Sequence, residues 1–290
     1  MSYYISEKQH LAANKERSTY APYIIDIPGI VRHDTPIKYG HPLYISICDV
    51  FELENSTDRP ITYPIIPDGC ISLIFSGINL PESGRICGST DRLKKIVMRP
   101  GEKILYIRFM PGACASFTNC EINTLTNTSA NEESVVKNGD RLMAIAGRDL
   151  PIQEKTTLMS RVLRTEKKEN ETGYLIRFCV ERILKREGNI MVGELAKDTG
   201  FSERYLGKVF EKHLGISPKT YIEIIRIQIS LKRLAISPPK SSLLDLALDS
   251  GYFDHSHMNR HYNKFLNCSS GTLRNKGFEK LDYSDVESYI

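Results

Sequence analysis

The fold is decided by two similar stretches, LAKDTGFSERYLGKVFEKHLGISPKTY at residues 195–221 and LALDSGYFDHSHMNRHYNKFLNCSSGTLR at residues 246–274. The second follows the first after about 51 residues and repeats its order: Leu-Ala, a glycine with an aromatic residue, and then an apolar stripe. A repeat at a fixed spacing indicates that one structural unit occurs twice. The region from Met191 to Arg274 is therefore expected to hold two copies of a small unit.

Each copy predicts a short helix that ends at a glycine and a second helix that begins at a capping residue. Gly200 and Gly251 can adopt the positive φ that turns the chain after a helix. Ser202 and Asp254 can accept the free backbone N–H groups of the next helix. Two such helices form a helix-turn-helix unit, whose second helix enters the major groove of DNA. In the first copy, the buried stripe at three- and four-residue spacing consists of Leu206, Val209, Phe210 and Leu214.

The residues of both copies resemble the DNA-binding domain of the AraC/XylS family of transcription regulators. The match covers roughly residues 170–278, and the segments Ala196–Tyr221 and Gly251–Phe265 carry it. Where the family has Phe-Gly-x-Ser-Pro, this chain has Leu266-Asn267-Cys268-Ser269-Ser270. Asparagine tolerates the left-handed conformation, so Asn267 is expected to replace that glycine. The resemblance implies a sequence-specific regulator of transcription, and an activator because that role is the commoner one in the family.

The outward faces of the two second helices hold the candidate DNA contacts. Arginine pairs with guanine and asparagine with adenine in the major groove, which favours Arg204, Arg260 and Asn259. The alternative is an ordinary solvated face. Helices are also expected over Tyr174–Arg186 and over Pro218–Ile236. The second of these connects the two units and should hold their second helices about one DNA turn apart. The complete set of candidates is Glu203, Arg204, Gly207, Lys208, His255, Ser256, Asn259, Arg260 and Asn263.

The excess of positive over negative charge is concentrated in the same half of the chain. Residues 170–282 hold 18 Lys and Arg against 13 Asp and Glu, whereas residues 1–169 hold 21 against 20. A basic excess attracts phosphate at long range, which agrees with DNA as the partner. His257 and His261 are spaced for a metal, but no carboxylate or cysteine completes a site, so no metal is expected there.

The sequence pattern of the first half of the chain predicts short strands separated by turns, which is typical of an antiparallel sandwich or small barrel. The segments Pro64–Phe75 and Ile107–Ala113 resemble the cupin-like sensor half of one group of AraC-type regulators. That resemblance implies a β-barrel with a small-molecule pocket. The expected class is α+β: a cupin-like sensor and dimerisation domain at 1–168 with flanking helices, and an all-α domain with two helix-turn-helix units at 169–282. The expected strands are Tyr23–Ile27, Leu43–Leu53, Ile71–Phe75, Lys95–Met98 and Leu105–Met110.

Arg108 stands inside one of these apolar strands. A guanidinium that faces a barrel interior needs an anionic partner, which makes Arg108 a candidate ligand-binding residue. The plainer interpretation, which we favour, is that strand alternation places it in solvent. His33 and His41 lack a His-x-His pattern with a following Glu, so a metal-loaded cupin site is not expected.

Beyond the strands, residues 119–139 read as a loop or lid over the sensor domain, and helices are expected at 140–146 and 153–168. The second helix has an apolar face that either packs on its own domain or pairs two subunits, and the two alternatives are left equal. A charged linker follows at 165–172. The apolar face consists of Leu158, Met159, Val162 and Leu163.

Composition narrows the class further. The 290 residues are 41% hydrophobic and 26% charged, without a run long enough to span a bilayer or an apolar secretory segment, so a cytoplasmic protein is expected. The seven cysteines form no Cys-x-x-Cys pair, which favours reduced thiols. No Gly-x-Ser-x-Gly or phosphate loop appears, so neither an enzyme nor a cofactor is expected. Expected partners are double-stranded DNA, RNA polymerase, a small-molecule effector and a second copy of the chain. The alternatives are a ligand-independent regulator and an enzyme with a regulatory DNA-binding module.

Overall fold

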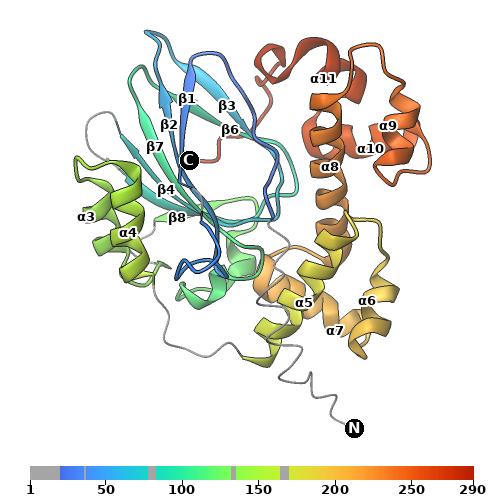
Figure 1. The fold of residues 1–290 in the computed structure, drawn as a ribbon, viewed down its shortest axis with the longest axis horizontal. Coiled ribbons are helices and arrows are strands. Elements are labelled where there is room, and N and C mark those ends of the chain that lie inside the picture. Colours follow the sequence, from blue (N-terminus) through green and yellow to red (C-terminus); the bar gives the residue numbers. More distant parts are fainter. Residues whose placement is uncertain (1–19, 36, 78–82, 132–134, 164–169) are drawn as a thin grey trace.

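A computed structural model describes residues 20–35, 37–77, 83–131, 135–163 and 170–290. A β domain occupies the first half and a helical domain the second (Figure 1). The strands are β1 Ile30–Thr35, β2 Ile47–Asn55, β3 Ile61–Ile65, β4 Ser72–Gly77, β5 Ser83–Cys87, β6 Lys94–Met98, β7 Lys103–Phe109 and β8 Ser129–Asn131. The helices are η1 Cys114–Ser116, η2 Ile122–Leu125, α3 Gly139–Ala146, α4 Ile152–Val162, α5 Glu171–Lys185, α6 Val192–Thr199, α7 Glu203–Leu214, α8 Pro218–Ile236, α9 Leu243–Asp249, α10 His255–Leu266, α11 Ser270–Lys276 and η3 Phe278–Lys280.

The β domain contains two antiparallel sheets. Six strands form one sheet in the order β1-β2-β7-β4-β5-β8, and β3 pairs with β6 in the other. Strand β7 is covered on both faces. Ile104 and Tyr106 belong to the core shared with the smaller sheet, whereas Leu105 and Ile107 belong to a second core with α3 and α4. Figure 1 shows α3 and α4 on the side of the β domain away from the helical domain.

The helical domain follows the predicted repeat closely. Ser202 accepts a hydrogen bond from the backbone N–H of Tyr205, and Asp254 accepts one from His257, so both predicted caps are confirmed. The left-handed Asn267 is also confirmed, with φ of 54°. Helix α8 spans the predicted Pro218–Ile236 and connects the two units.

The two domains share one hydrophobic core, because α8 packs against the β domain. Gln228 of α8 is 1% exposed, and its side chain joins two segments of the β domain. Its Oε1 accepts the backbone N–H of Tyr23 at 2.6 Å, and its Nε2 donates to the carbonyl of Pro67 at 2.7 Å. Nearby, a Cβ at Gly69 would lie 2.4 Å from Cε2 of Tyr221, so only glycine permits this approach.

Three sequence-based expectations were wrong. Residues 23–27 form no strand, because the N–H of Tyr23 is used by Gln228 instead of a neighbouring strand. Residues 119–139 are no simple lid: β8 extends the sheet, and Thr126 donates to the carbonyl of Gly215 at the end of α7. The second predicted helix ends at Val162, and residues 164–169, with most of the predicted linker, lie outside the described residues.

The Gln228 contact leads to a stability prediction. Gln228→Leu keeps the side-chain volume but leaves the half-buried N–H of Tyr23 and the buried carbonyl of Pro67 without this partner. We expect the free energy of unfolding to fall by about 1–3 kcal/mol, measured by urea denaturation followed by circular dichroism. The matched control is Gln153→Leu on the exposed face of α4, which should change it by less than about 0.5 kcal/mol. Equal losses in the two variants would contradict the structural role of Gln228.

Candidate nucleic-acid interface and sensor pocket

Helix α7 presents a polar face to solvent. Leu206, Phe210 and Leu214 are fully buried on the other side, as the three- and four-residue spacing predicted. Glu203, Arg204 and Lys208 are exposed, and Gly207 is half-buried between them, so the predicted contact face of the first unit is available to a ligand.

Helix α10 is only partly available. Ser256, Arg260 and Asn263 are exposed, and Arg260 occupies the helix position that Lys208 has in α7. His255 and Asn259 are half-buried and bind α11 instead. Asn259 Oδ1 accepts the backbone N–H of Ser270 at 3.0 Å and its hydroxyl at 2.8 Å, and His255 Nε2 lies 3.1 Å from that hydroxyl.

These contacts give Asn259 a structural role beside the predicted contact with adenine. Its amide nitrogen lies 3.0 Å from His255 Nε2, so both ends of the side chain are occupied within the protein. The structure assigns Asn259 to the junction between α10 and α11, where it satisfies the first backbone N–H of α11. This contact could not be read from the sequence, because an amide on a recognition helix suits adenine equally well.

Two histidines behind this face form an aromatic cluster with Tyr252. The ring centroid of His257 lies 5.4 Å from that of Tyr252, and the ring centroid of His261 lies 5.2 Å from it. Burial lowers the pKa of His261 to about 4, so the imidazole is neutral near pH 7. Among the described residues, no three His, Cys, Asp or Glu side chains gather in a way that could hold a metal.

Exposed aromatic residues at both turns were missed as candidates. Phe201 and Tyr205 stack with centroids 4.8 Å apart, and Phe253 in the equivalent turn of the second unit is 86% exposed. Their positions next to the second helices were readable from the repeat. Aromatic side chains at these points extend the candidate surface beyond the charged residues.

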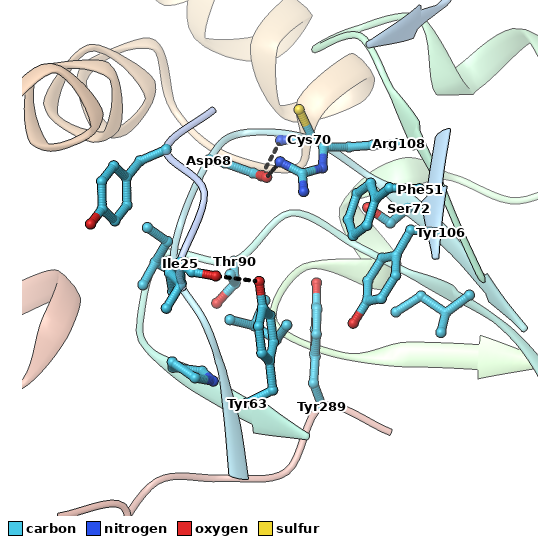
Figure 2. A pocket seen from close by; sticks show the side chains of 15 residues that line it. Ile25, Phe51, Tyr63, Asp68, Cys70, Ser72, Thr90, Tyr106, Arg108 and Tyr289 are labelled. Carbon is cyan, nitrogen blue, oxygen red and sulfur yellow. Dashed lines mark hydrogen bonds and ion pairs between the residues drawn. The ribbon is translucent and has the colours of Figure 1, made fainter. Parts of the chain in front are cut away.

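The β domain contains a cavity between its two sheets. It offers about 50 Å³ of space to the centres of water-sized molecules and is partly open to solvent, and Tyr63, Tyr106 and Arg108 line it (Figure 2). Arg108 thus faces inward with Tyr106 and Ile104, two and four residues before it on β7. The solvent-face interpretation was wrong, because the Arg108 side chain is only 12% exposed and lines the cavity, while Leu105 and Ile107 on the opposite face of β7 are buried in the core with α3 and α4.

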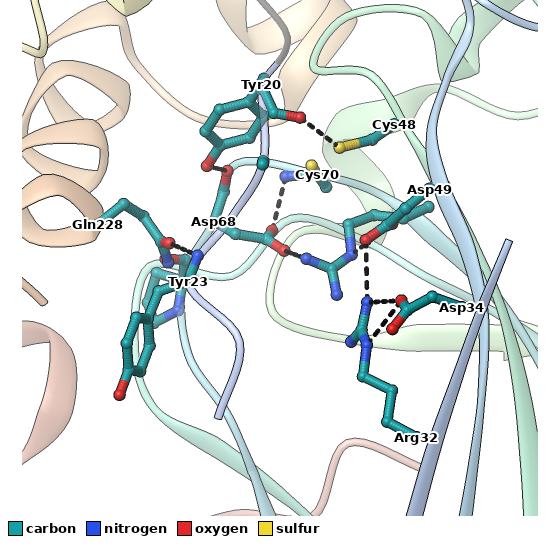
Figure 3. Close-up of polar contacts among 12 residues, drawn as sticks. Tyr20, Tyr23, Arg32, Asp34, Cys48, Asp49, Asp68, Cys70 and Gln228 are labelled. Atoms are coloured by element: carbon teal, nitrogen blue, oxygen red, sulfur yellow. Dashed lines mark hydrogen bonds and ion pairs between the residues drawn. The ribbon is translucent and has the colours of Figure 1, made fainter. Parts of the chain in front are cut away.

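Arg108 has the anionic partners that burial requires. Its Nε lies 3.3 Å from Asp49 Oδ1, and its Nη1 lies 3.1 Å from Asp68 Oδ2 (Figure 3). Asp49 also pairs with Arg32 at 3.3 Å, so the charges form a chain. Burial raises the pKa of Asp68, and Arg108 opposes that rise.

The turn that carries Asp68 links the cavity to the helical domain. Its carboxylate faces Arg108, while its carbonyl accepts the hydroxyl of Tyr20 at 2.6 Å. The neighbouring residues Pro67 and Gly69 contact Gln228 and Tyr221 of α8, respectively. Residues 67–70 therefore belong to both the cavity wall and the domain junction.

The four residues of the predicted dimerisation face do not share one environment. Met159 and Leu163 are 1% and 2% exposed and pack into the core of their own domain. Leu158 and Val162 are half-buried against the same core. All four residues therefore pack on their own domain, the first of the two alternatives, and dimerisation through α4 stays a prediction.

The remaining expectations concern thiols and membranes. The seven cysteines are free thiols, five of them buried. Burial raises the pKa of Cys87 and of Cys179 to about 12, which keeps both in the thiol form. In the described part of the chain, no helix is both long and apolar enough to cross a membrane.

Comparisons with known proteins bear on both halves. Residues 195–276 match a family described as a helix-turn-helix domain, and residues 42–131 match a domain of unknown function, DUF6597. The XylDLEGF operon transcriptional activator 1 of Pseudomonas putida is 36% identical over 107 residues, which cover 36% of this chain and 31% of that protein. The HTH-type transcriptional regulator MtrA of Neisseria gonorrhoeae is 25% identical over 128 residues, or 44% of this chain and 40% of that protein.

The chain thus spans well under half the length of these curated relatives. Among solved structures, ToxT from Vibrio cholerae is 9% identical with a TM-score of 0.42, over 89% of this chain and 100% of that chain. The repeat, both caps and both exposed second-helix faces agree with the family match to residues 195–276. The C-terminal part of this chain, residues 195–276, therefore matches a family of helix-turn-helix domains in both sequence and fold.

Proposed function

We propose that the protein is a sequence-specific DNA-binding transcription regulator whose β domain senses a small molecule. The observation that carries this proposal is the pair of equivalent helices, α7 and α10, each capped, each exposed on one face, and each with a cation at its sixth position. Those cations are Lys208 and Arg260. Relatives that share this domain are named as transcriptional regulators, which supports the same class.

The connection through α8 supports simultaneous binding of both units. Its 19 residues span about 28 Å at the rise of an α-helix. That length is close to one turn of B-DNA, about 34 Å. Because α8 is continuous and buried, both second helices are held at one fixed separation, as two adjacent major grooves on one face of a duplex require.

The cavity supports control by a small molecule. Arg108 and Asp68 place charge in a cavity that is lined mainly by aromatic and apolar side chains, a combination that fixes the orientation of a ligand. A ligand that binds Arg108 competes with Asp68 and so disturbs the turn at residues 67–70. Since α8 rests on this turn, ligand binding alters the support of the DNA-binding units. As an activator, the protein would act with RNA polymerase, and a second copy would add affinity through α4.

The base-reading prediction concerns Arg204 and Arg260. Each exposed guanidinium can pair with guanine, so Arg204→Ala or Arg260→Ala should weaken specific binding by about 1–3 kcal/mol and change non-specific binding much less. Fluorescence anisotropy with DNA from upstream of the protein's own gene, and with random DNA of equal length, measures both quantities. Arg59→Ala, an exposed residue between β2 and β3 of the β domain, removes the same charge from outside both second helices and α4, and is the control. Equal losses on both DNAs would show phosphate contacts instead of base reading.

Asn259 should behave differently from its neighbour Asn263. Asn259→Ala removes the acceptor for the backbone N–H and hydroxyl of Ser270, so the unfolding free energy should fall by about 1–3 kcal/mol. Asn263→Ala, on the exposed face of the same helix, should change it by less than about 0.5 kcal/mol. Thermal denaturation of the two variants gives the comparison. An unchanged stability of Asn259→Ala, with altered preference for adenine in the DNA site, would restore the base-reading role.

A further inference from the structure

The last described residues return from the DNA-binding domain to the sensor domain. Residues 277–290, here called the return segment, follow α11 directly and run to the β domain beside β6 (Figure 1). Phe278 contacts Tyr23 with ring centroids 6.2 Å apart. Val286 and Tyr289 are 6% and 7% exposed, so the segment is packed and not loosely attached.

Backbone pairing fixes the register of the return segment on β6. Lys95 donates its N–H to the carbonyl of Glu287 at 3.1 Å, and Tyr289 donates its N–H to the carbonyl of Lys95 at 2.9 Å. Lys95 also donates from Nζ to the carbonyl of Tyr283 at 2.6 Å. The segment therefore pairs with the free edge of β6 through a single parallel bridge between Lys95 and Ser288, as an added chain can at an unpaired sheet edge.

An ion pair strengthens this attachment. The side chain of Lys94 is 3% exposed and pairs with Glu287, whose side chain is 68% exposed. The hydrogen bond from Lys94 holds the pKa of Glu287 below its usual range. Because a buried ammonium needs an anionic partner, Glu287 specifies where the segment docks.

Tyr289, near the end of the return segment, places its side chain in the wall of the sensor cavity. It lines the cavity together with Tyr63 and Tyr106, and its hydroxyl donates to the carbonyl of Gly88 (Figure 2). The cavity thus already holds one phenol ring, that of Tyr289, through the backbone carbonyl of Gly88. The hydroxyl of Tyr106 in the same cavity is a buried polar group without a hydrogen-bond partner among the described residues.

The other end of the return segment is tied to the second recognition helix. It begins after α11, whose first residue Ser270 is hydrogen-bonded to Asn259 and His255 of α10. One continuous stretch, with α11 at its start and Tyr289 near its end, therefore touches both the candidate DNA-binding face and the sensor cavity. This is a physical connection between the two sites through a single short segment.

We propose, building on the regulator function above, that the cavity binds small phenols and that Tyr289 occupies part of that site as a built-in competitor. A phenol that takes the position of the Tyr289 ring can donate to the carbonyl of Gly88 and fill the space beside Tyr106. Its binding releases the return segment from β6 and loosens α11 against α10. The ligand shifts this balance by the difference in its affinity for the docked and released arrangements.

The competition sets the size of the expected effect. When the binding-competent state is a fraction of the population, the apparent dissociation constant rises by the inverse of that fraction. If the return segment is released in about one molecule in ten or fewer, its removal strengthens phenol binding about tenfold or more. Weakening the segment without removing it should give a smaller gain.

The test uses p-cresol, the side-chain analogue of tyrosine, with the full chain and isothermal titration calorimetry. Tyr289→Ala should bind p-cresol at least about tenfold more tightly than the wild type. Glu287→Gln and Tyr289→Phe each remove one attachment and should give intermediate gains. Asp285→Asn, an exposed carboxylate of the same segment, is the matched control and should bind as the wild type does. Toluene, which lacks the hydroxyl that donates to Gly88, should bind Tyr289→Ala more weakly than p-cresol.

Equal p-cresol affinity in the wild type, Glu287→Gln and Tyr289→Phe would overturn the proposal even if Tyr289→Ala fails to fold, and so would the absence of binding to all of them. Hydrogen exchange of the wild type gives the second readout: saturating p-cresol should increase exchange at residues 283–289 and in α11. Binding without that increase would also overturn it. Neither measurement contains DNA, so a failure of the chain to bind DNA would refute the regulator function separately.

Discussion

The buried amide of Gln228 is the contact on which the arrangement of this protein depends. It sits in the middle of α8 and satisfies the backbone of Tyr23 and of Pro67, two segments far apart in the sequence. A buried amide of this kind is stable only when both its donor and its acceptor are used, which fixes the position of α8 on the β domain. Tyr221 against Gly69 fixes the same helix one and a half to two turns earlier.

This constraint makes the sensor and the DNA-binding units parts of one core. Apolar residues of the smaller sheet, of α5 and of α8 belong to a single buried cluster. The turn at residues 67–70 lies between the Arg108 ion pairs and Gln228 of α8 (Figure 3). The return segment connects the cavity to α11 (Figure 1). A change inside the cavity therefore has two physical routes to the second helix-turn-helix unit, one through packing and one through a detachable segment.

The sequence predicted local features well because they depend on a few neighbouring residues. The caps Ser202 and Asp254, the left-handed Asn267 and the limits of α8 all follow from short-range chemistry. The candidate contacts Arg204 and Arg260 are exposed because the apolar stripe of each helix decides which face is buried.

Contacts between distant segments could not be predicted in the same way. Side chains along β7 alternate between its two faces, and Arg108 follows this pattern. Alternation identifies a solvent-facing side only when one face of the strand is open, and here both faces contribute to a core. Asn259 and Tyr23 have polar groups that several partners could satisfy, and only the folded chain brings Ser270 and Gln228 to them. The return segment mixes apolar residues such as Val286 and Tyr289 with charged ones, and their contacts depend on the free edge of β6, which lies far away in the sequence.

Native-state hydrogen exchange tests most directly whether α8 joins both domains into one cooperative unit. The measurement gives the free energy of opening for amides of α8 and of β7 at increasing concentrations of denaturant. If the domains share one core, the most protected amides around Gln228 and around Tyr106 converge to the same opening free energy with the same denaturant dependence. Opening of α8 at a distinctly lower free energy, while β7 stays protected, would contradict the account, because the domains would then unfold separately.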